Sequence, residues 1–181
     1  MIQFVTQRIA KGITAFAIVS STLVASTFWG TAGDVAVAHA DALAAPADAR
    51  LSAEAQLIDA VNADRAANGL APLAIDAELT DIARWRSDDM VARDYFSHDI
   101  GGYQVFTVMK DRGIGYRLAG ENLAYNYQPL NKTVAAAEVA LMNSPSHRAN
   151  ILREDFSHIG VGMAVGTDGK VVFTQLFMRG W

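Results

Sequence analysis

Apolar residues recur at helical spacing through the middle of the chain and predict two long helices. The first is expected to run from Ser52, which can cap it, to about Asn68, with Gly69 as its stop. The second is expected to begin after Asp76, another capping residue type. Arg86 interrupts its apolar stripe, so we expect that part of the helix to face polar partners.

Two shorter helices are predicted further along the chain. One spans about residues 104–111 and ends before Gly113. The other begins at Thr133, carries apolar residues on one face, and is limited in length by Pro145, which cannot continue a helix. His98 lies in the connection between the second and the third of these four helices.

The last quarter of the chain changes to a period of two, which is typical of β-strands. Residues 159–165 alternate bulky side chains with Gly160, Gly162 and an alanine, so one face of this strand is nearly bare. We expect a helix to pack closely against that bare face. The Asp-Gly pair at 168–169 predicts a hairpin turn, and residues 171–177 form the returning strand. Helices first and strands last indicate an α+β domain with helices layered on an antiparallel sheet.

The N-terminus has the order of a secretory signal. Arg8 and Lys11 precede an uncharged run at residues 13–29, and small residues follow it. Cleavage is expected after Ala32 or, alternatively, after Ala40. The uncharged run is also near the lower length limit for spanning a bilayer, so an uncleaved membrane anchor is the alternative to an extracellular or periplasmic protein.

After a signal peptide at residues 1–32, residues 33–52 are expected to be a linker, because this stretch is rich in Ala, Pro and Asp. Residues 53–181 then form one domain, long enough to bury a core. The whole chain has 15 Lys and Arg against 19 Asp and Glu, a net charge of −4. This balance argues against a nucleic-acid partner and a polybasic membrane patch. There are no cysteines, so packing must stabilise the exported domain without disulfides.

Three polar segments contain the candidate functional residues His98, Glu121 and His147. Two imidazoles and a carboxylate from separate segments are suitable ligands for zinc with an open coordination position. The same groups could serve as a general acid/base set. Each also has a structural interpretation, in which His98 bonds the carbonyls at a helix end and Glu121 ties a loop. His147 would then hold the turn at Pro145 or pair with a neighbouring acid.

Five segments together resemble a known family. They are NADRAANGLAPL at 62–73, YFSH at 95–98, GENLA at 120–124, SPSHR at 144–148 and IGVG at 159–162. These motifs resemble the CAP superfamily of cysteine-rich secretory, venom antigen-5 and plant pathogenesis-related proteins, and especially its cysteine-free bacterial branch of SCP-like extracellular proteins. The resemblance covers roughly residues 53–178. It implies a three-layer α-β-α sandwich with a central antiparallel sheet.

The resemblance also implies a cleft built from two histidines and two acidic residues. His98 and His147 match the two histidines, and Glu121 matches the first glutamate. Ser144 stands where the resemblance places the second glutamate, and Leu141 stands where it places a tryptophan. The cleft is therefore expected to contain His98, Glu121, His147 and Ser144, with the first three as ligands for a metal. Glu138 lies six residues before the missing acid, so on a helix it would point away from the cleft.

Three functions are compatible with these residues. The favoured hypothesis is a secreted module for an extracellular or cell-envelope ligand, with a divalent metal, preferably zinc, in its cleft. The second is a metal-assisted hydrolase of peptide or cell-envelope bonds, with Glu121 as base. The missing second acid argues against it, as does the absence of the common Gly-x-Ser-x-Gly and His-Glu-x-x-His motifs. The third, suggested by the resemblance, is a lipid or sterol carrier with an apolar groove between helices.

Overall fold

The computed structural model describes residues 47–180 of the chain. The predicted signal peptide of residues 1–32, both of its cleavage points and most of the predicted linker lie outside the described residues. Within the described range, no helix has the length and apolar character needed to cross a bilayer.

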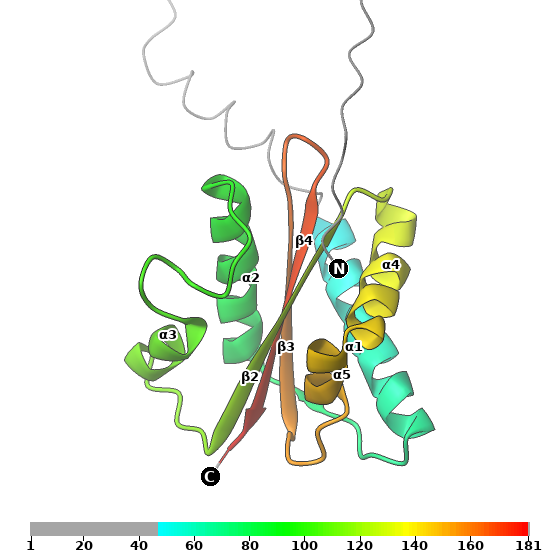
Figure 1. The fold of residues 1–181 in the computed structure, drawn as a ribbon, viewed down its shortest axis with the longest axis vertical. Helices are drawn as coiled ribbons and strands as arrows, with labels where there is room; N and C mark the ends of the chain where they lie inside the picture. Colours follow the sequence, from blue (N-terminus) through cyan, green and yellow to red (C-terminus); the bar gives the residue numbers. More distant parts are fainter. Residues whose placement is uncertain (1–46, 181) are drawn as a thin grey trace, which may run out of the picture. The chain divides into compact units, whose positions relative to one another are not determined.

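The described residues form helices and strands that alternate along most of the chain. In chain order these are α1 (Ala47–Ala67), β1 (Ala74–Ile75), α2 (Ala77–Ala92), α3 (Val105–Asp111), β2 (Leu118–Asn126), α4 (Leu130–Asn143), α5 (Pro145–Ile151), β3 (His158–Val165) and β4 (Val171–Arg179). Figure 1 shows the sheet between two groups of helices, with α2 and α3 on one side and α1, α4 and α5 on the other. The predicted α+β class and the three-layer α-β-α sandwich are therefore confirmed.

The central sheet has the strand order β1-β3-β4-β2. The three long strands are antiparallel, and the hairpin between β3 and β4 turns at Gly169, whose φ of +82° suits glycine. β1 pairs with β3 in parallel through Ala74 and Ile75. The sheet is thus mixed, because this two-residue strand adds one parallel pair to the predicted antiparallel sheet.

Two helices begin earlier than predicted, while a third begins where expected. α1 begins at Ala47 and so takes in the end of the predicted linker, and α4 begins at Leu130 instead of Thr133. The alanine-rich residues before Ser52 have high helix propensity, which outweighs the capping potential of the serine. Asp76 caps α2 as predicted, and its side chain accepts a hydrogen bond of 2.9 Å from a backbone N–H in the first turn.

The sequence analysis did not predict β2 or α5. β2 contains the GENLA segment, in which Gly120, Glu121 and Asn122 have low strand propensity. Every residue of β2 nevertheless pairs with β4, and this pairing outweighs the local preference. α5 begins directly at Pro145, whose ring fixes the φ angle that the first residue of a helix requires.

The close contact between α2 and β3 confirms the prediction made from the bare strand face. A Cβ atom added at Gly160 would overlap the backbone of Leu79, and one added at Gly162 would overlap the backbone of Ala83. The hydroxyl of Ser87 also donates a hydrogen bond of 3.0 Å to the carbonyl of Gly162. Glycine is required here because the helix backbone lies directly on the strand.

The motif at residues 62–73 holds the end of α1 against its neighbours. Asn62 exchanges two hydrogen bonds with the backbone of Leu73, at 2.8 and 3.2 Å. Arg65 is fully buried and donates to the carbonyls of Ala71 and Ile151 at 2.9 and 2.8 Å, which connects α1 to the end of α5. These motif residues therefore stabilise the scaffold and do not reach the cleft.

Candidate functional site

β2 directs two neighbouring polar residues to opposite faces of the sheet. Successive side chains of a strand alternate between faces, so Glu121 points toward α2 and Asn122 points toward α5. Both side chains are buried. The candidate site therefore spans the outer strand of the sheet and receives residues from both helical layers.

Glu121 lies between one buried cation and one exposed imidazole. Its Oε1 accepts from Arg86 Nε at 3.2 Å, and its Oε2 lies 2.6 Å from His98 Nδ1. Only 3% of the Glu121 side chain is exposed, whereas half of the His98 side chain is exposed. Both carboxylate oxygens thus have partners within the protein. Glu121 is shielded from solvent, and it contacts the exposed His98 ring.

Arg86 is fully buried in α2 and organises the segment that leads to His98. Besides Glu121, its guanidinium donates to the hydroxyl of Tyr95 and to the carbonyl of Ser97. The Tyr95 hydroxyl in turn donates to Asp89, one turn further along α2. The predicted polar environment of Arg86 is confirmed, and the residue connects α2, β2 and the His98 loop.

The His98 loop is further shaped by backbone hydrogen bonds to Asp99. The Asp99 carboxylate accepts from the N–H groups of Gly101 and Gly102 at 2.7 and 2.6 Å, and these bonds lower its pKa. Both glycines have positive φ angles, which the tight turn requires. His98 therefore sits on a loop whose two ends are fixed, by Arg86 before it and by Asp99 after it.

His147 is carried by α5 and is half-buried. Burial lowers the pKa of its imidazole, and the nearby charge of His98 lowers it further. A neutral imidazole at neutral pH keeps one ring nitrogen free to accept a proton or bind a metal. His98 is thus the second cause of the lowered pKa of His147, and a shared site for the two rings stays a prediction.

Asn122 positions the helix that carries His147. Its Nδ2 donates to the backbone carbonyl of His147 and to Gln175 Oε1, both at 3.0 Å. Its Oδ1 accepts from Asn150 Nδ2 at 2.8 Å. Sequence reasoning missed Asn122, which lies inside the motif at 120–124, and Asn150, since nothing in the sequence shows which polar residues meet. Asn122 thereby ties α5 to the sheet.

Ser144 lies at the junction of α4 and α5 and is half-buried. Within the described residues its hydroxyl has one side-chain neighbour, Ser146 Oγ, at 3.4 Å. Leu141 is buried in the core, and Glu138 faces a groove between α1 and α4, as its predicted orientation away from the cleft required. Within residues 47–180, no carboxylate is hydrogen-bonded to the Ser144 hydroxyl.

Residues 47–180 contain no group of three His, Cys, Asp or Glu side chains close enough to hold a metal ion. Arg86 and His98 also occupy both oxygens of Glu121. The donors that remain available are the two imidazoles.

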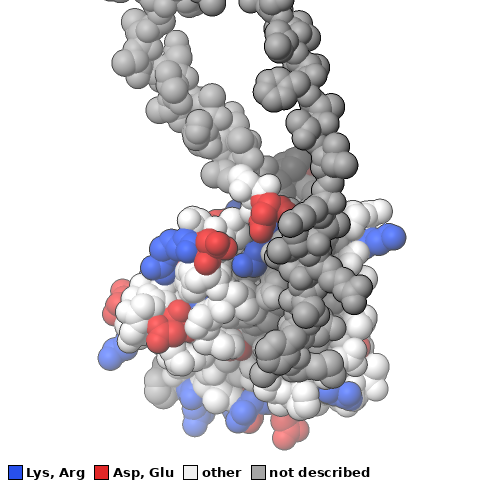
Figure 2. Space-filling model, turned by 45° about the horizontal axis from the view of Figure 1, so that its top comes forward, with Lys and Arg blue, Asp and Glu red and all other residues white. Residues whose placement is uncertain are grey.

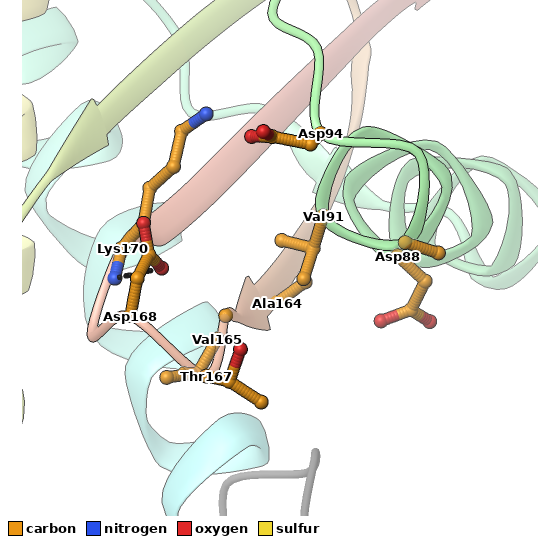
Figure 3. Close-up of a pocket in the computed structure, with 10 residues that line it drawn as sticks. Asp88, Val91, Asp94, Ala164, Val165, Thr167, Asp168 and Lys170 are labelled. Atoms are coloured by element: carbon orange, nitrogen blue, oxygen red, sulfur yellow. Dashed lines mark hydrogen bonds between the residues drawn. The ribbon is translucent and has the colours of Figure 1, made fainter.

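A pocket lies beside the C-terminal end of α2 and contains none of the predicted site residues (Figure 3). It has a volume of about 520 Å³ and lies between that helix end and the hairpin of β3 and β4. Asp94, Asp168 and Lys170 line it, so its charges are mixed. Figure 2 likewise shows acidic and basic side chains interspersed on one face of the described residues.

The chain has clear relatives in sequence and in structure. Residues 58–177 match the family model CAP, described as the cysteine-rich secretory protein family. The protein YkwD of Bacillus subtilis (strain 168) is 40% identical over 126 residues, which is 69% of this chain and 46% of YkwD. The membrane protein YlbC of the same organism is 34% identical over 131 residues, 72% of this chain and 35% of YlbC.

Two solved structures show the same fold. An extracellular protein containing an SCP domain, from Bacillus anthracis str. Ames, matches with a TM-score of 0.62 and 33% identity, over 72% of this chain and 41% of that one. An outer surface protein from Borrelia burgdorferi matches with a TM-score of 0.64 and 24% identity, over 72% of this chain and 94% of that one. The chain thus spans less than half the length of YkwD and YlbC.

Proposed function

Because this chain belongs to the CAP family of cysteine-rich secretory proteins, we propose that it is an exported interaction module whose cleft binds a divalent metal ion through His98 and His147. The observation that carries the proposal is the contact of 2.6 Å between Glu121 Oε2 and His98 Nδ1. A carboxylate on one ring nitrogen fixes the tautomer and directs the other nitrogen outward, which is the usual support of a metal-binding histidine.

Each residue of the site has a defined part in this proposal. Arg86 bonds Glu121 and keeps it in place, so that Glu121 can hold the His98 ring. The lowered pKa of His147 keeps its ring neutral, which is the form that binds metals. Zinc suits imidazole ligands, and when bound it would supply a positive centre that attracts anionic or carbonyl groups of a partner.

The alternative of a metal-assisted hydrolase is weaker. A general base must reach the proton that it removes. Glu121 instead faces Arg86 and His98 with its two oxygens, and Ser144 provides no second carboxylate. We therefore assign the cleft to binding, and the partner is an extracellular or cell-envelope ligand.

Export is part of the same proposal. The N-terminal secretory pattern supports it, and so does the description of one relative as an extracellular protein and another as an outer surface protein. YlbC is described as a membrane protein, which matches the alternative of an uncleaved anchor. The mass of the mature protein, measured by mass spectrometry, would distinguish cleavage after Ala32, cleavage after Ala40 and retention of the signal.

The test is a calorimetric titration of zinc into the metal-free protein at neutral pH. We expect one-to-one binding that is weakened at least tenfold by His98→Ala and by His147→Ala, because each removes one of two protein ligands. The matched control is His158→Ala, since His158 lies at the start of β3 and bonds Ser157 at 2.8 Å. Equal zinc affinity in all four proteins would refute the metal cleft.

A further inference from the structure

A groove separate from the cleft runs between α1 and α4. Its volume is about 470 Å³. Figure 1 shows these two helices side by side on the face of the sheet opposite α2. The walls are mainly small or flexible apolar side chains, namely Ala60, Ala63, Ala135, Val139 and Met142. Val139 is 61% exposed, so the groove opens to solvent.

Glu138 lines this groove and has no hydrogen-bond partner in the described part of the chain. The residue is 8% exposed, and both of its carboxyl oxygens are buried. Leaving a buried polar group without a partner costs about 1–3 kcal/mol of stability. Such groups are uncommon in folded proteins, and one that faces a groove marks a place where a ligand can supply the missing bond.

A second acidic residue, Asp64, approaches the groove from α1. Burial raises the pKa of Glu138 to about 8, and Asp64 contributes to this shift. The neighbouring Arg65 cannot neutralise the pair, because it is buried and bonded to the carbonyls of Ala71 and Ile151. Two acidic groups and apolar walls therefore meet in one groove without a cation between them among the described residues.

We propose that the groove between α1 and α4 binds the primary ammonium group of an aliphatic amine, with Glu138 and Asp64 as its acceptors. An ammonium group offers three donors, which suits two carboxyl groups on opposite walls. The alkyl chain would cover the alanines and Met142 and so remove apolar surface from water. A fatty acid is a poorer match, because its carboxylate would meet the negative charge of Asp64.

Binding of the amine is coupled to loss of a proton. A cation next to Glu138 favours the ionised carboxylate, so a proton leaves as the ammonium enters. Affinity should consequently rise between pH 6 and pH 9, while an alkylammonium, with a pKa of about 10.4 like that of lysine, stays charged. Asp64 is the charged group that acts on Glu138 from the facing helix.

The experiment uses the full chain and three probes with the same six-carbon stem, hexylammonium, hexanol and hexanoate. Isothermal titration should show one-to-one binding of hexylammonium, stronger at pH 8.5 than at pH 6.5, and at least tenfold weaker binding of the other two. Glu138→Gln and Asp64→Asn should each weaken hexylammonium binding at least tenfold. The matched control is Glu154→Gln, which removes an exposed carboxylate elsewhere.

Several outcomes would overturn the proposal. If hexanoate binds as tightly as hexylammonium, the groove is a general apolar or fatty-acid site. Absent hexylammonium binding at millimolar concentration, or unchanged binding in Glu138→Gln, would also reject it. A comparison with Nα-acetyl-lysine methylamide assigns the source, because stronger binding than hexylammonium indicates a lysine side chain of a peptide and weaker binding a free amine.

The result is independent of the metal cleft. His98→Ala/His147→Ala should keep full hexylammonium affinity while it loses zinc. Loss of amine binding in this double variant would place the amine in the cleft and refute the assignment to the groove.

Discussion

Glu121 on β2 and Glu138 on α4 are both buried glutamates, and their side chains meet different surroundings. Glu121 points toward α2, where Arg86 and His98 occupy its two oxygens. Glu138 points into the groove between α1 and α4, where neither oxygen has a partner and Asp64 adds a second negative group. The same residue type therefore has both oxygens bonded at one position, and at the other it is unbonded with a pKa raised to about 8 by burial.

The difference shows that partners, more than burial, decide what a buried acid can do. A third case, Glu54, supports this view, because Arg50, Arg84 and the backbone N–H of Met163 all bond its carboxylate. A fully bonded glutamate fixes the geometry of its neighbours. An unbonded glutamate has free acceptor oxygens, which a ligand with hydrogen-bond donors can use.

The largest expected change in stability comes from removing the buried partner of Glu121. Arg86→Met removes the partner of a buried carboxylate and should lower the free energy of unfolding by about 3–5 kcal/mol. Urea denaturation measures this loss. The double variant Arg86→Met/Glu121→Leu should recover much of it, because no unpaired charge remains. A double variant as unstable as Arg86→Met would show that Arg86 acts through its bonds to Tyr95 and Ser97 instead.

Substitution of Glu138 should change the free energy of unfolding in the opposite direction. Glu138→Leu removes an unpartnered acid and should raise the free energy of unfolding by about 1–3 kcal/mol at pH 8.

The gain should depend on pH with a defined sign. The folded pKa of about 8 exceeds the ordinary value of 4.5, so the folded protein binds this proton more tightly than the unfolded chain. The contribution of Glu138 to the free energy of unfolding is then fully present below pH 4.5 and declines as pH rises toward 8. The advantage of Glu138→Leu should therefore be smallest at pH 4.5 and largest at pH 8. An equal gain at both values would mean that Glu138 does not titrate in this range.

The smallest effect is expected at Glu54. Arg84→Met removes one cation, but Arg50 and the Met163 N–H still bond the carboxylate. The loss in free energy of unfolding should be about 1 kcal/mol, well below that of Arg86→Met. Urea denaturation of the two variants side by side tests whether the number of remaining partners sets the cost. A loss at Glu54 as large as that at Glu121 would refute this explanation.

Much of the fold could be predicted from periodicity and special residues. Asp76 marked the start of α2, and the alternation at Gly160 and Gly162 marked the close contact of that helix with β3. Arg86 stood out because it interrupts an apolar stripe. β2 was missed because its Gly-Glu-Asn sequence disfavours a strand, and only pairing with β4 reveals it.

The candidate site was predicted in part. His98 contacts Glu121, whereas a common site with His147 stays a prediction. The contacts of Asn122 with Asn150 and Gln175 depend on three separate elements, so no local pattern shows them. The burial of Glu138 without a partner was also hidden, since it results from how α4 packs against α1. Zinc and export remain predictions for the experiments above.

β2 lies at one end of the strand order, so within the described residues it bonds β4 on one side and leaves its other edge free. A free edge is a template for self-association between copies. The inward charge of Glu121 and the bond of 3.3 Å from Asn150 to the Glu121 carbonyl interrupt the middle of this edge. We therefore expect Glu121 and Asn150 to limit strand pairing between copies, and variants that lose both should aggregate before they unfold.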